Sequence, residues 1–373
     1  MPTAPRVRQG MTLGLVFGAV LFAGAASGAW GEPIGSPRAP SSSDGLRGAD
    51  LTGADLSPQE ARQLVGASGD RWAAYLSPQQ YRDFTGGRYP GVGLSVGRSA
   101  DGPTEVAEVL PGSPAARAGI TAGERLVTVD GVPAEELPVT EVVSRLRGGP
   151  AGSAVALGVQ GEDGPVRELR LTRAELAARE VETDRPRPGV ARIAVHAFTE
   201  GVADQVRAAA AGARGVVLDL RGNSGGLVEE AVGVASVFLD GGPVASYQVH
   251  GEQRELTAAA GGDTAVPLVV LVDGGTMSAA ELLAGALQDR SRAVLVGART
   301  FGKGTVQQPS RLADGSVLEL TVGRYRTPAG GSPDGTGVQP DVPAPAGDED
   351  GAETLALKVL DGLSPADQEP AAP

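Results

Sequence analysis

The stretch "PLVVLVDGGTMSAAELLAGALQDRSRAVLVGA", Pro267 to Ala298, decides the fold class of this chain. A run of branched apolar residues leads through a Gly-Gly turn into an alanine- and leucine-rich helical stretch, and a second apolar run follows. The same order recurs upstream, in "ARIAVHAF", "VADQVRAAAAG", "GVVLDL" and "VEEAVGVASVFLD". Apolar strands that alternate with helices are typical of a parallel sheet covered on both faces. The sequence therefore predicts an α/β core.

The composition excludes several classes of function. The chain has 373 residues, 41% of them hydrophobic, which is enough for more than one folded domain. Its formal charge is −13 and no basic stripe is interleaved with aromatic residues, so nucleic acid is not an expected partner. The absence of cysteine and the presence of only two histidines, His196 and His250, argue against thiol chemistry and clustered metal ligands. We expect no metal and no other cofactor.

The N-terminal stretch predicts export from the cytoplasm. Arg6 and Arg8 precede "MTLGLVFGAVLFAGAASGAW", an uncharged apolar run from Met11 to Trp30 that ends in small residues. Its length suits a cleaved signal peptide and also a retained membrane anchor, and the sequence leaves both open. We therefore expect an extracytoplasmic protein, with membrane contact through this segment in the second case.

The rest of the chain divides by composition and pattern. A Pro/Ser/Gly-rich linker precedes two short helices with Ser-Pro-Gln starts, and short strands broken by turns then form a β-rich module. The predicted boundaries are 1–30 signal peptide or anchor, 31–56 linker, 57–88 helical segment, 89–173 β-rich module, 174–345 α/β core and 346–373 C-terminal helix and disordered tail.

The β-rich module carries a signal for peptide binding. In "YPGVGLSV" a glycine-spaced loop runs into a strand, so the backbone N–H groups of Gly91, Val92, Gly93 and Leu94 are candidates to hold a peptide carboxylate. The strand edge would pair with the peptide itself. Glycine-rich turns before strands are common, but the following "GSPAARAGITAGERLVTVDGVPAEEL" strengthens the interpretation.

One candidate nucleophile is Ser224. "GNSGG", Gly222 to Gly226, satisfies G-x-S-x-G between an apolar strand and a helix, the setting of a nucleophile elbow. The acid and histidine that must follow are available only as Asp240 and His250, in or near a turn-rich stretch, and no HGGG-type motif precedes the serine. The alternative is a glycine-rich turn whose backbone N–H groups bind an oxyanion.

A second candidate, Ser278, is paired with an unusual lysine. Ser278 opens a helix after an apolar strand, where a helix-capping serine is the alternative interpretation. Lysine occurs only at Lys303 and Lys358 among 32 cationic residues, and Lys303 lies 25 positions after Ser278, past the next strand. Adjacent strand ends in an α/β sheet would bring the two together, and a serine–lysine pair needs neither histidine nor cysteine.

Such a lysine must be largely neutral, which arginine cannot be. Lowering its pKa from about 10.4 by about 3 units requires roughly 4 kcal/mol of differential environment. The neighbours Phe301, Gly302, Gly304 and Val306 predict burial, and the alternative is a surface lysine. Gln307 is placed to hold the amine by a side-chain hydrogen bond.

These motifs together resemble the carboxyl-terminal processing proteases, also called tail-specific proteases, over roughly Asp70 to Gly362. The residues that carry the resemblance are "GDRWAAYLSPQQYRDF", "GVGLSV", "GSPAARAGITAGERLVTVDG", "GVVLDLRGNSGGLVEEAVGVASVFL", "PLVVLVDGGTMSAAELLAGALQDRSRAVLVGARTFGKGTVQ" and "DGSVLELTVGRYRTPAGGSPDGTGVQPDV", in that order. The resemblance implies a PDZ domain inserted before a serine protease core with the strand–helix alternation of crotonase and ClpP.

The resemblance also implies roles for individual residues. The nucleophile of the family falls on Ser278, its base on Lys303 and its supporting glutamine on Gln307. Its oxyanion donors are backbone amides, here Ala279 and, among the glycines of "GNSGG", Gly225. Thr276 and Met277 depart from the small residues that usually precede the serine in this family.

The expected function is that of a serine endopeptidase that takes protein or peptide substrates by accessible C-terminal tails. Three other interpretations stay open from the residues: a non-catalytic PDZ adaptor, an esterase based on Ser224 and His250, and coupling of peptide binding to activation through Arg147. The sequence leaves the substrate, the cleaved bond and oligomerisation undecided.

Overall fold

The computed structural model describes residues 56–98, 102–137, 139–162, 164–249, 252–345 and 348–363. The predicted signal peptide or anchor and the linker lie outside these residues. The chain divides into two compact units: residues 83–182 form the smaller unit, and residues on either side of it form the larger one. None of the helices in the described part of the chain is both long and apolar enough to span a membrane.

The larger unit is built on a six-stranded sheet with the order β10-β11-β12-β15-β16-β19. From β11 to β19 the neighbouring strands are parallel. β12 and β15 are buried along their whole length, as their unbroken apolar sequences predict. The strand bounds are β10 Val181–Arg187, β11 Val190–Val195, β12 Gly215–Asp219, β15 Leu268–Val272, β16 Val294–Gly297 and β19 Val342–Pro343.

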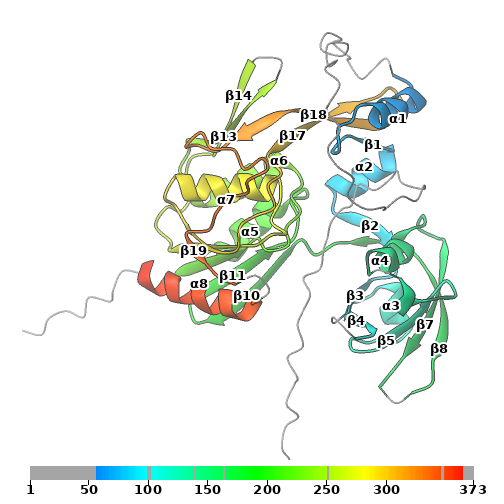
Figure 1. Cartoon of the computed structure of the whole chain (residues 1–373). Coiled ribbons are helices and arrows are strands. Elements are labelled where there is room, and N and C mark those ends of the chain that lie inside the picture. Colours follow the sequence, from blue (N-terminus) through cyan, green and yellow to red (C-terminus); the bar gives the residue numbers. More distant parts are fainter. Residues whose placement is uncertain are drawn as a thin grey trace, which may run out of the picture. The chain divides into compact units, whose positions relative to one another are not determined.

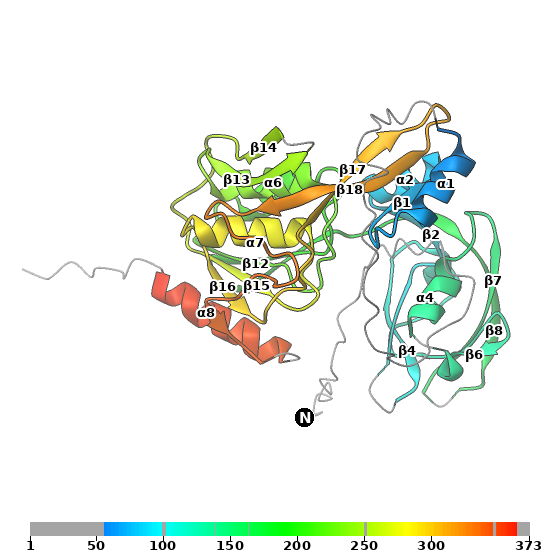
Figure 2. The ribbon, with the colours of Figure 1, turned by 45° about the horizontal axis from the view of Figure 1, so that its top comes forward.

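Helices cover both faces of this sheet, which confirms the predicted α/β alternation. α8 packs Ala352, Ala356 and Leu360 against β12, β15 and β16 on one face. α7 lies on the other face (Figure 2) and contacts α6, and α6 in turn contacts α5. The helix bounds are α5 Val202–Ala210, α6 Val228–Phe238, α7 Ala279–Asp289 and α8 Glu349–Leu363.

A second, five-stranded sheet of the larger unit has the order β1-β18-β13-β14, with β17 also paired to β18. Its strands come from distant parts of the chain: β1 Ala74–Leu76, β13 Pro243–Val249, β14 Glu252–Thr257, β17 Thr305–Arg311 and β18 Val317–Arg326. β1 pairs antiparallel with β18, Ala74 facing Glu319. This three-residue strand was not predicted, because so short a run shows no period in the sequence.

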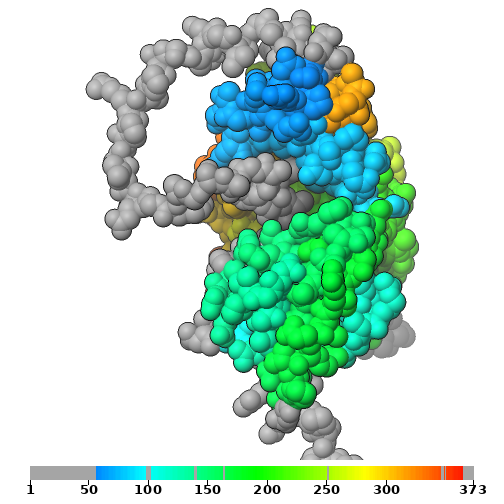
Figure 3. Space-filling view, turned by 90° about the vertical axis from the view of Figure 1, so that its right-hand side faces the viewer, coloured from blue at the N-terminus to red at the C-terminus, as the bar shows by residue number. Residues whose placement is uncertain are grey.

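The segment before β1 is attached to the same sheet. α1 (Pro58–Ala67) begins at Ser57, which forms a capping box with Glu60. Ala61 of α1 forms a small core with Leu312 and Leu318 of the β17–β18 hairpin. In Figure 3 the blue residues of α1 accordingly lie beside the orange residues of the hairpin. α2 (Pro78–Thr85) follows β1.

The smaller unit is a separate β-rich body with its own apolar core (Figure 1). Its main sheet has the order β3-β4-β5-β7-β8, with β6 paired to β5, while β2 pairs with β9. β3 is an edge strand of this sheet, and α4 contacts it. The bounds are β2 Arg88–Gly91, β3 Leu94–Arg98, β4 Thr104–Val109, α3 Pro114–Arg117, β5 Arg125–Val129, β6 Val132–Pro133, the 3₁₀ helix η2 Ala134–Glu136, α4 Val139–Arg147, β7 Ala154–Gln160, β8 Arg167–Thr172 and β9 Ala174–Ala177.

Candidate active site

Ser278 lies in the turn between β15 and α7, at the N-cap position of the helix. Its backbone has φ +58° and ψ −118°, and a positive φ is uncommon for a residue with a side chain. Such strained positions persist only where the surroundings fix them, and they are concentrated at functional sites. The N–H of Ser278 donates to Oε2 of Glu281, at 2.9 Å. Ser278 is half-buried.

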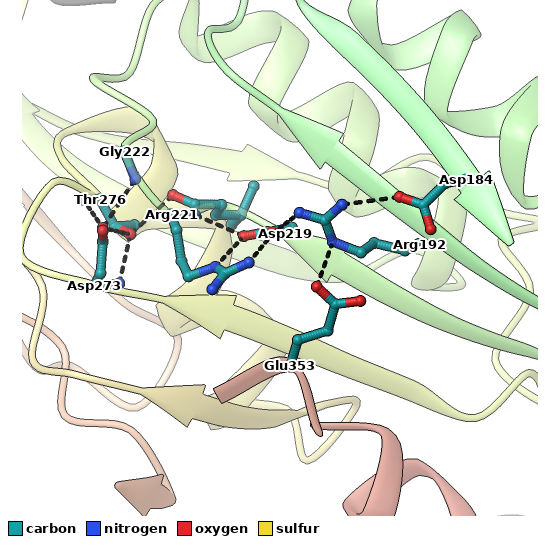
Figure 4. A network of polar contacts seen from close by, with 9 residues as sticks. Asp184, Arg192, Asp219, Arg221, Gly222, Asp273, Thr276 and Glu353 are labelled. Atoms are coloured by element: carbon teal, nitrogen blue, oxygen red, sulfur yellow. Dashed lines mark hydrogen bonds and ion pairs between the residues drawn. The ribbon is translucent and has the colours of Figure 1, made fainter. Parts of the chain in front are cut away.

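Asp273 ties the serine turn to the neighbouring strand end. Its Oδ1 accepts hydrogen bonds from the N–H groups of Gly222 (2.9 Å), Gly275 (2.9 Å) and Thr276 (3.0 Å). The hydroxyl of Thr276 donates to the carbonyl of Leu220 at 2.9 Å. Figure 4 shows these contacts joining the turn after β12 to the turn after β15. The two glycine-containing turns are therefore held side by side.

Gly225 packs directly against the serine. A Cβ at Gly225 would lie 2.9 Å from Cβ of Ser278, and the residue has φ +99°. Its N–H donates to Oδ1 of the buried Asn223 at 2.8 Å, and Nδ2 of Asn223 donates to the carbonyl of Val195 at 2.8 Å. Gly225 thus lies beside the serine, but in this arrangement its N–H is already bonded within the loop.

Ala279 provides an N–H group at the start of α7. At this first helical position the N–H has no partner within the helix. Among the residues that the structure describes, no acceptor is assigned to it. The N-terminus of the eleven-residue α7 adds a partial positive charge at this point. The position favours a developing negative charge near Ser278.

Lys303 is joined to the serine turn by one buried carboxylate. Oε2 of Glu281, which is also bonded to Ser278, accepts the N–H of Lys303 at 2.8 Å. Oε1 of Glu281 accepts the N–H of Gly302 at 2.7 Å and the hydroxyl of Thr300 at 2.6 Å. Glu281 is 0% exposed, so these four donors satisfy a charge that would be costly to bury alone.

Tyr325 of β18 makes a second connection between the same two residues. Its hydroxyl lies 2.7 Å from the carbonyl oxygen of Ser278 and 3.1 Å from that of Lys303. The side chain is buried, and burial raises the pKa of Tyr325 well above its usual value. It therefore stays a neutral donor. The structure thus brings Ser278 and Lys303 together.

The surroundings of the Lys303 amine favour its neutral form. Burial lowers the pKa of Lys303, against the carboxylates of Glu319 and Asp70, which raise it, while the Arg71 guanidinium lowers it further. Nζ lies 4.3 Å from the centre of the Trp72 ring. Among the described residues no hydrogen bond joins Nζ to the hydroxyl of Ser278. The predicted source of burial was partly wrong, since Phe301 is 50% exposed and the indole of Trp72 covers the amine instead.

Gln307 lies on β17, close to the same site. Its Nε2 donates to the hydroxyls of Thr305 (3.0 Å) and Thr321 (3.1 Å). The hydroxyl and the N–H of Thr321 donate to the carboxylate of Asp70, at 3.1 and 2.8 Å. These contacts fix the orientation of the Gln307 amide and leave its Oε1 as the atom able to accept from an amine.

The alternative histidine-dependent site stays a hypothesis, because the structure does not describe its histidine. His250 lies outside the described residues. Asp240 accepts the N–H of Gly261 in an exposed turn at 2.7 Å. In the part of the chain that the structure describes, no cluster of acidic residues and histidines has the arrangement of a metal site.

In the smaller unit the glycine-spaced loop has fixed carbonyl groups. The carbonyl of Val92 accepts the N–H of Ala115, and that of Gly93 accepts the N–H of Leu110, both at 2.9 Å. Gly93 has φ +79°, and a Cβ there would collide with Ser113. The loop leads directly into the edge strand β3. Arg147 stacks on Tyr89 of the same unit, with its guanidinium 4.3 Å from the ring centre.

A network of charged residues surrounds the end of β12 and the turn that follows it. The buried carboxylate of Asp219 contacts Arg221 (2.6 and 2.8 Å) and Arg192 (2.7 Å) (Figure 4). Arg192 also contacts Asp184 and, at 3.5 Å, Glu353 of α8. Burial raises the pKa of Asp219, but the hydrogen bonds and charges of the two arginines outweigh it and bring the pKa below its usual value.

Sequence reasoning missed four of these residues: Glu281, Trp72, Tyr325 and Asp273. Glu281 stands three positions after Ser278, and this spacing is the signal of a capping box that marks it for attention. Asp273 joins two neighbouring strand ends of one sheet, whereas Trp72 and Tyr325 reach the site from the segment before β1 and from β18. No sequence period connects these residues with the site. Only the tertiary structure shows their contacts with the site.

Comparison with known proteins gives consistent matches. The model of peptidase family S41 matches residues 189–344, and that of a PDZ domain matches residues 105–161. A carboxyl-terminal-processing protease of Picosynechococcus sp. is 36% identical over 300 residues, which cover 76% of this chain and 72% of that protein. Carboxyl-terminal-processing peptidase 2, chloroplastic, of Arabidopsis thaliana is 37% identical over 309 residues, covering 76% of this chain and 59% of that protein.

A solved structure agrees with these matches. The chain is similar to a photosystem II D1 C-terminal processing protease, with a TM-score of 0.50 and 32% identity, over 81% of this chain and 87% of that one.

Proposed function

The chain belongs to peptidase family S41 and is a protease of the carboxyl-terminal-processing group with a PDZ domain, and from this premise we propose that it is a serine endopeptidase. In this proposal Ser278 is the nucleophile and Lys303 is the general base. The observation that carries the proposal is the shared Oε2 of Glu281, which binds the N–H groups of both residues. This shared contact holds the backbones of the two residues close to each other, and a nucleophile and its base must lie near each other for proton transfer.

In the proposed reaction, the neutral Lys303 amine takes the proton of the Ser278 hydroxyl as its oxygen attacks the peptide carbonyl. The tetrahedral oxyanion is stabilised by the N–H of Ala279 and by the positive end of α7, with a further N–H from the "GNSGG" turn. The ammonium then protonates the leaving amine, which departs as the new N-terminus of the released fragment. Water, deprotonated by the same lysine, hydrolyses the acyl-enzyme and restores Ser278.

Gln307 holds the base in this proposal. Its Nε2 is engaged by two threonine hydroxyls, so its Oε1 is the atom that accepts a hydrogen bond from the Lys303 amine. Gly225 contributes chiefly through its missing side chain, since its N–H is bonded to Asn223 unless the loop rearranges when substrate binds.

The PDZ domain supplies the substrate. The free carboxylate of a protein tail binds the N–H groups of the loop from Gly91 to Leu94, and the tail adds a strand to the edge of β3. Val92, Gly93 and the start of β3 at Leu94 have the fixed backbone that this mode needs. Substrates are then proteins with accessible C-terminal tails. The protease acts on them outside the cytoplasm, after residues 1–30 have directed its export.

The test is cleavage of a disordered peptide with a free apolar C-terminus by the protein without residues 1–30, beside the same peptide with an amidated C-terminus. We expect Ser278→Ala and Lys303→Arg each to lose at least 10³-fold in kcat, while Ser224→Ala keeps activity. The amidated peptide should have a higher KM. Binding of the free peptide by the parent without any cleavage would instead support a non-catalytic PDZ adaptor.

A further inference from the structure

Trp72 lies at the candidate active site although it belongs to the segment that precedes the PDZ domain. Nζ of Lys303 is 4.3 Å from the centre of its ring, and the guanidinium of Arg71 is 4.5 Å from the same centre. The edge of the ring meets Phe301, with 6.4 Å between the ring centres and 69° between their planes. One indole thus contacts both the amine and the exposed aromatic residue two positions before it.

The backbone that carries this ring is tied to β18 by hydrogen bonds. The backbone N–H of Trp72 donates to Oδ1 of Asp70 at 2.9 Å. The carboxylate of Asp70 accepts the N–H of Thr321 at 2.8 Å and its hydroxyl at 3.1 Å. The hydroxyl of Thr321 also accepts from Gln307. A continuous chain of hydrogen bonds therefore connects the backbone of Trp72 to Gln307 of β17, and β1 pairs with β18 immediately afterwards.

The indole can act on the amine in two physical ways. Its face attracts a cation through the ring quadrupole, which stabilises the ammonium form. Its bulk excludes water from one side of the amine, which destabilises the ammonium form. A flexible lysine chain has rotamers that lead into solvent, and a ring held against Nζ removes them.

We propose that Trp72 is a positioning residue for the general base, limiting the rotamers of the Lys303 side chain and keeping its amine out of bulk water. The proposal rests on the proposed function, in which Lys303 is that base. The segment before the PDZ domain then contributes a residue to the active site. Asp70 and β1 attach this segment to β18 and so determine where Trp72 lies.

The other groups that face the amine are charged, so the effect of the ring can be separated from theirs. Glu319 comes from β18, Glu281 from α7, and Asp70 and Arg71 from the same segment as the ring. Substitution of Trp72 removes none of these four charges, although Arg71 loses the ring on which it stacks. Trp72→Leu keeps apolar cover without an aromatic face, Trp72→Ala removes the cover, and Trp72→Phe keeps an aromatic face.

The experiment is an NMR titration of the full chain labelled with ¹³C at lysine Cε. Only two lysines exist, and Lys358 is exposed on α8, so its signal is an internal reference. We expect the pKa of Lys303 to fall in Trp72→Leu, because the cation loses the ring face, and to rise in Trp72→Ala, because water reaches the amine. Trp72→Phe should titrate close to the parent. An unchanged titration of Lys303 in both the Leu and Ala variants would overturn the proposal.

Kinetics provide a second readout of the same variants. Trp72→Ala should lower kcat at pH 7 about tenfold or more with little change in KM, and higher pH should restore part of the loss. Trp72→Phe should retain most of the activity. The control is Tyr75→Leu, which removes a ring on β1 that stacks on Arg62 at 4.7 Å and does not contact Lys303. An equal loss in Tyr75→Leu, independent of pH, would show a merely structural role. The titration decides the matter even if the parent fails to cleave any peptide.

Discussion

Oε2 of Glu281 accepts a hydrogen bond from the N–H of Lys303 at 2.8 Å, across 22 positions of sequence. The same oxygen accepts the N–H of Ser278, so a single buried atom sets the spacing between the backbones of the two residues. The contact is shielded from bulk solvent, because Glu281 is fully buried. The geometry of the proposed dyad therefore depends on a residue that does not take part in the chemistry.

Glu281→Gln should impair catalysis and stability together. The amide has nearly the same shape, but one of its two ends donates and cannot accept, so two of the four donors lose their partner. We expect kcat to fall roughly 100-fold, since displacement of reacting groups by about 1 Å has that effect. We expect the free energy of unfolding to fall by about 2–4 kcal/mol, as buried hydrogen bonds to a charge are lost. Peptide kinetics and urea titration measure the two effects.

The matched control for this prediction is Glu229→Gln, in the first turn of α6, where the side chain is exposed. It should leave kcat and the free energy of unfolding equal to those of the parent within experimental error. Full activity of Glu281→Gln would show that the spacing of Ser278 and Lys303 is maintained by other contacts, with Tyr325 the first candidate.

Gly225→Ala should abolish most activity through a single methyl group. The new Cβ would lie 2.9 Å from Cβ of Ser278, closer than real Cβ atoms approach, and 3.0 Å from the carbonyl oxygen of Met277, which is an unusually tight contact. The serine turn must then move, with a loss in kcat of roughly 100-fold or more. Gly261→Ala is the control, because its φ of +91° carries the same backbone cost while nothing lies within 4 Å. Similar kinetics for the two variants would contradict the close contact.

Glu319→Gln should move the pH dependence of catalysis toward acid. Burial lowers the pKa of Lys303, and the Glu319 carboxylate raises it. Removal of this carboxylate should therefore lower the pKa of Lys303. A larger fraction of the amine is then neutral below pH 7, and the acid limb of kcat/KM shifts to lower pH. Burial raises the pKa of Glu319 itself, against the charge of Lys303, which lowers it. Glu255→Gln on the exposed strand β14 should leave the profile unchanged, and a shift toward alkaline pH in Glu319→Gln would contradict the assignment.

The fold could be predicted from the sequence where one physical rule dominates. The buried runs of β12 and β15 read as parallel strands because both faces of each strand are covered, and the helices between them follow from period and composition. β1 could not be found this way. Its three residues form a strand only because β18 offers a partner more than two hundred positions later.

The candidate site was predicted only in part for a related reason. Ser278 and Lys303 lie at adjacent strand ends of a parallel sheet, so topology alone makes them neighbours. Trp72 and Tyr325 reach the site from other segments, and the bonding of Gly225 to Asn223 depends on a loop conformation that composition does not specify. Sequence therefore indicates which residues have the right chemistry, whereas the contacts that tune them require the three-dimensional structure.

Asp219→Asn should destabilise the larger unit in a pH-dependent way. The change leaves Arg221 and Arg192 without the buried carboxylate that they share, and removal of one partner from a buried ion pair costs about 3–5 kcal/mol. The pKa of Asp219 is lower in the folded protein than in the unfolded chain. Its contribution to stability is therefore present above the unfolded value of about 3.8 and disappears as the pH falls through the folded value.

The unfolding free energies of parent and Asp219→Asn should accordingly differ most near pH 7 and converge as the pH approaches the folded pKa of Asp219. Urea titrations at several pH values, down to the lowest at which the parent stays folded, measure this difference. Asp184→Asn removes the exposed partner of Arg192 and should cost less than about 1 kcal/mol at any pH. A loss of stability in Asp219→Asn that stays constant with pH would contradict this account. It would mean that the hydrogen bonds lost with the second carboxylate oxygen matter more at this position than the negative charge.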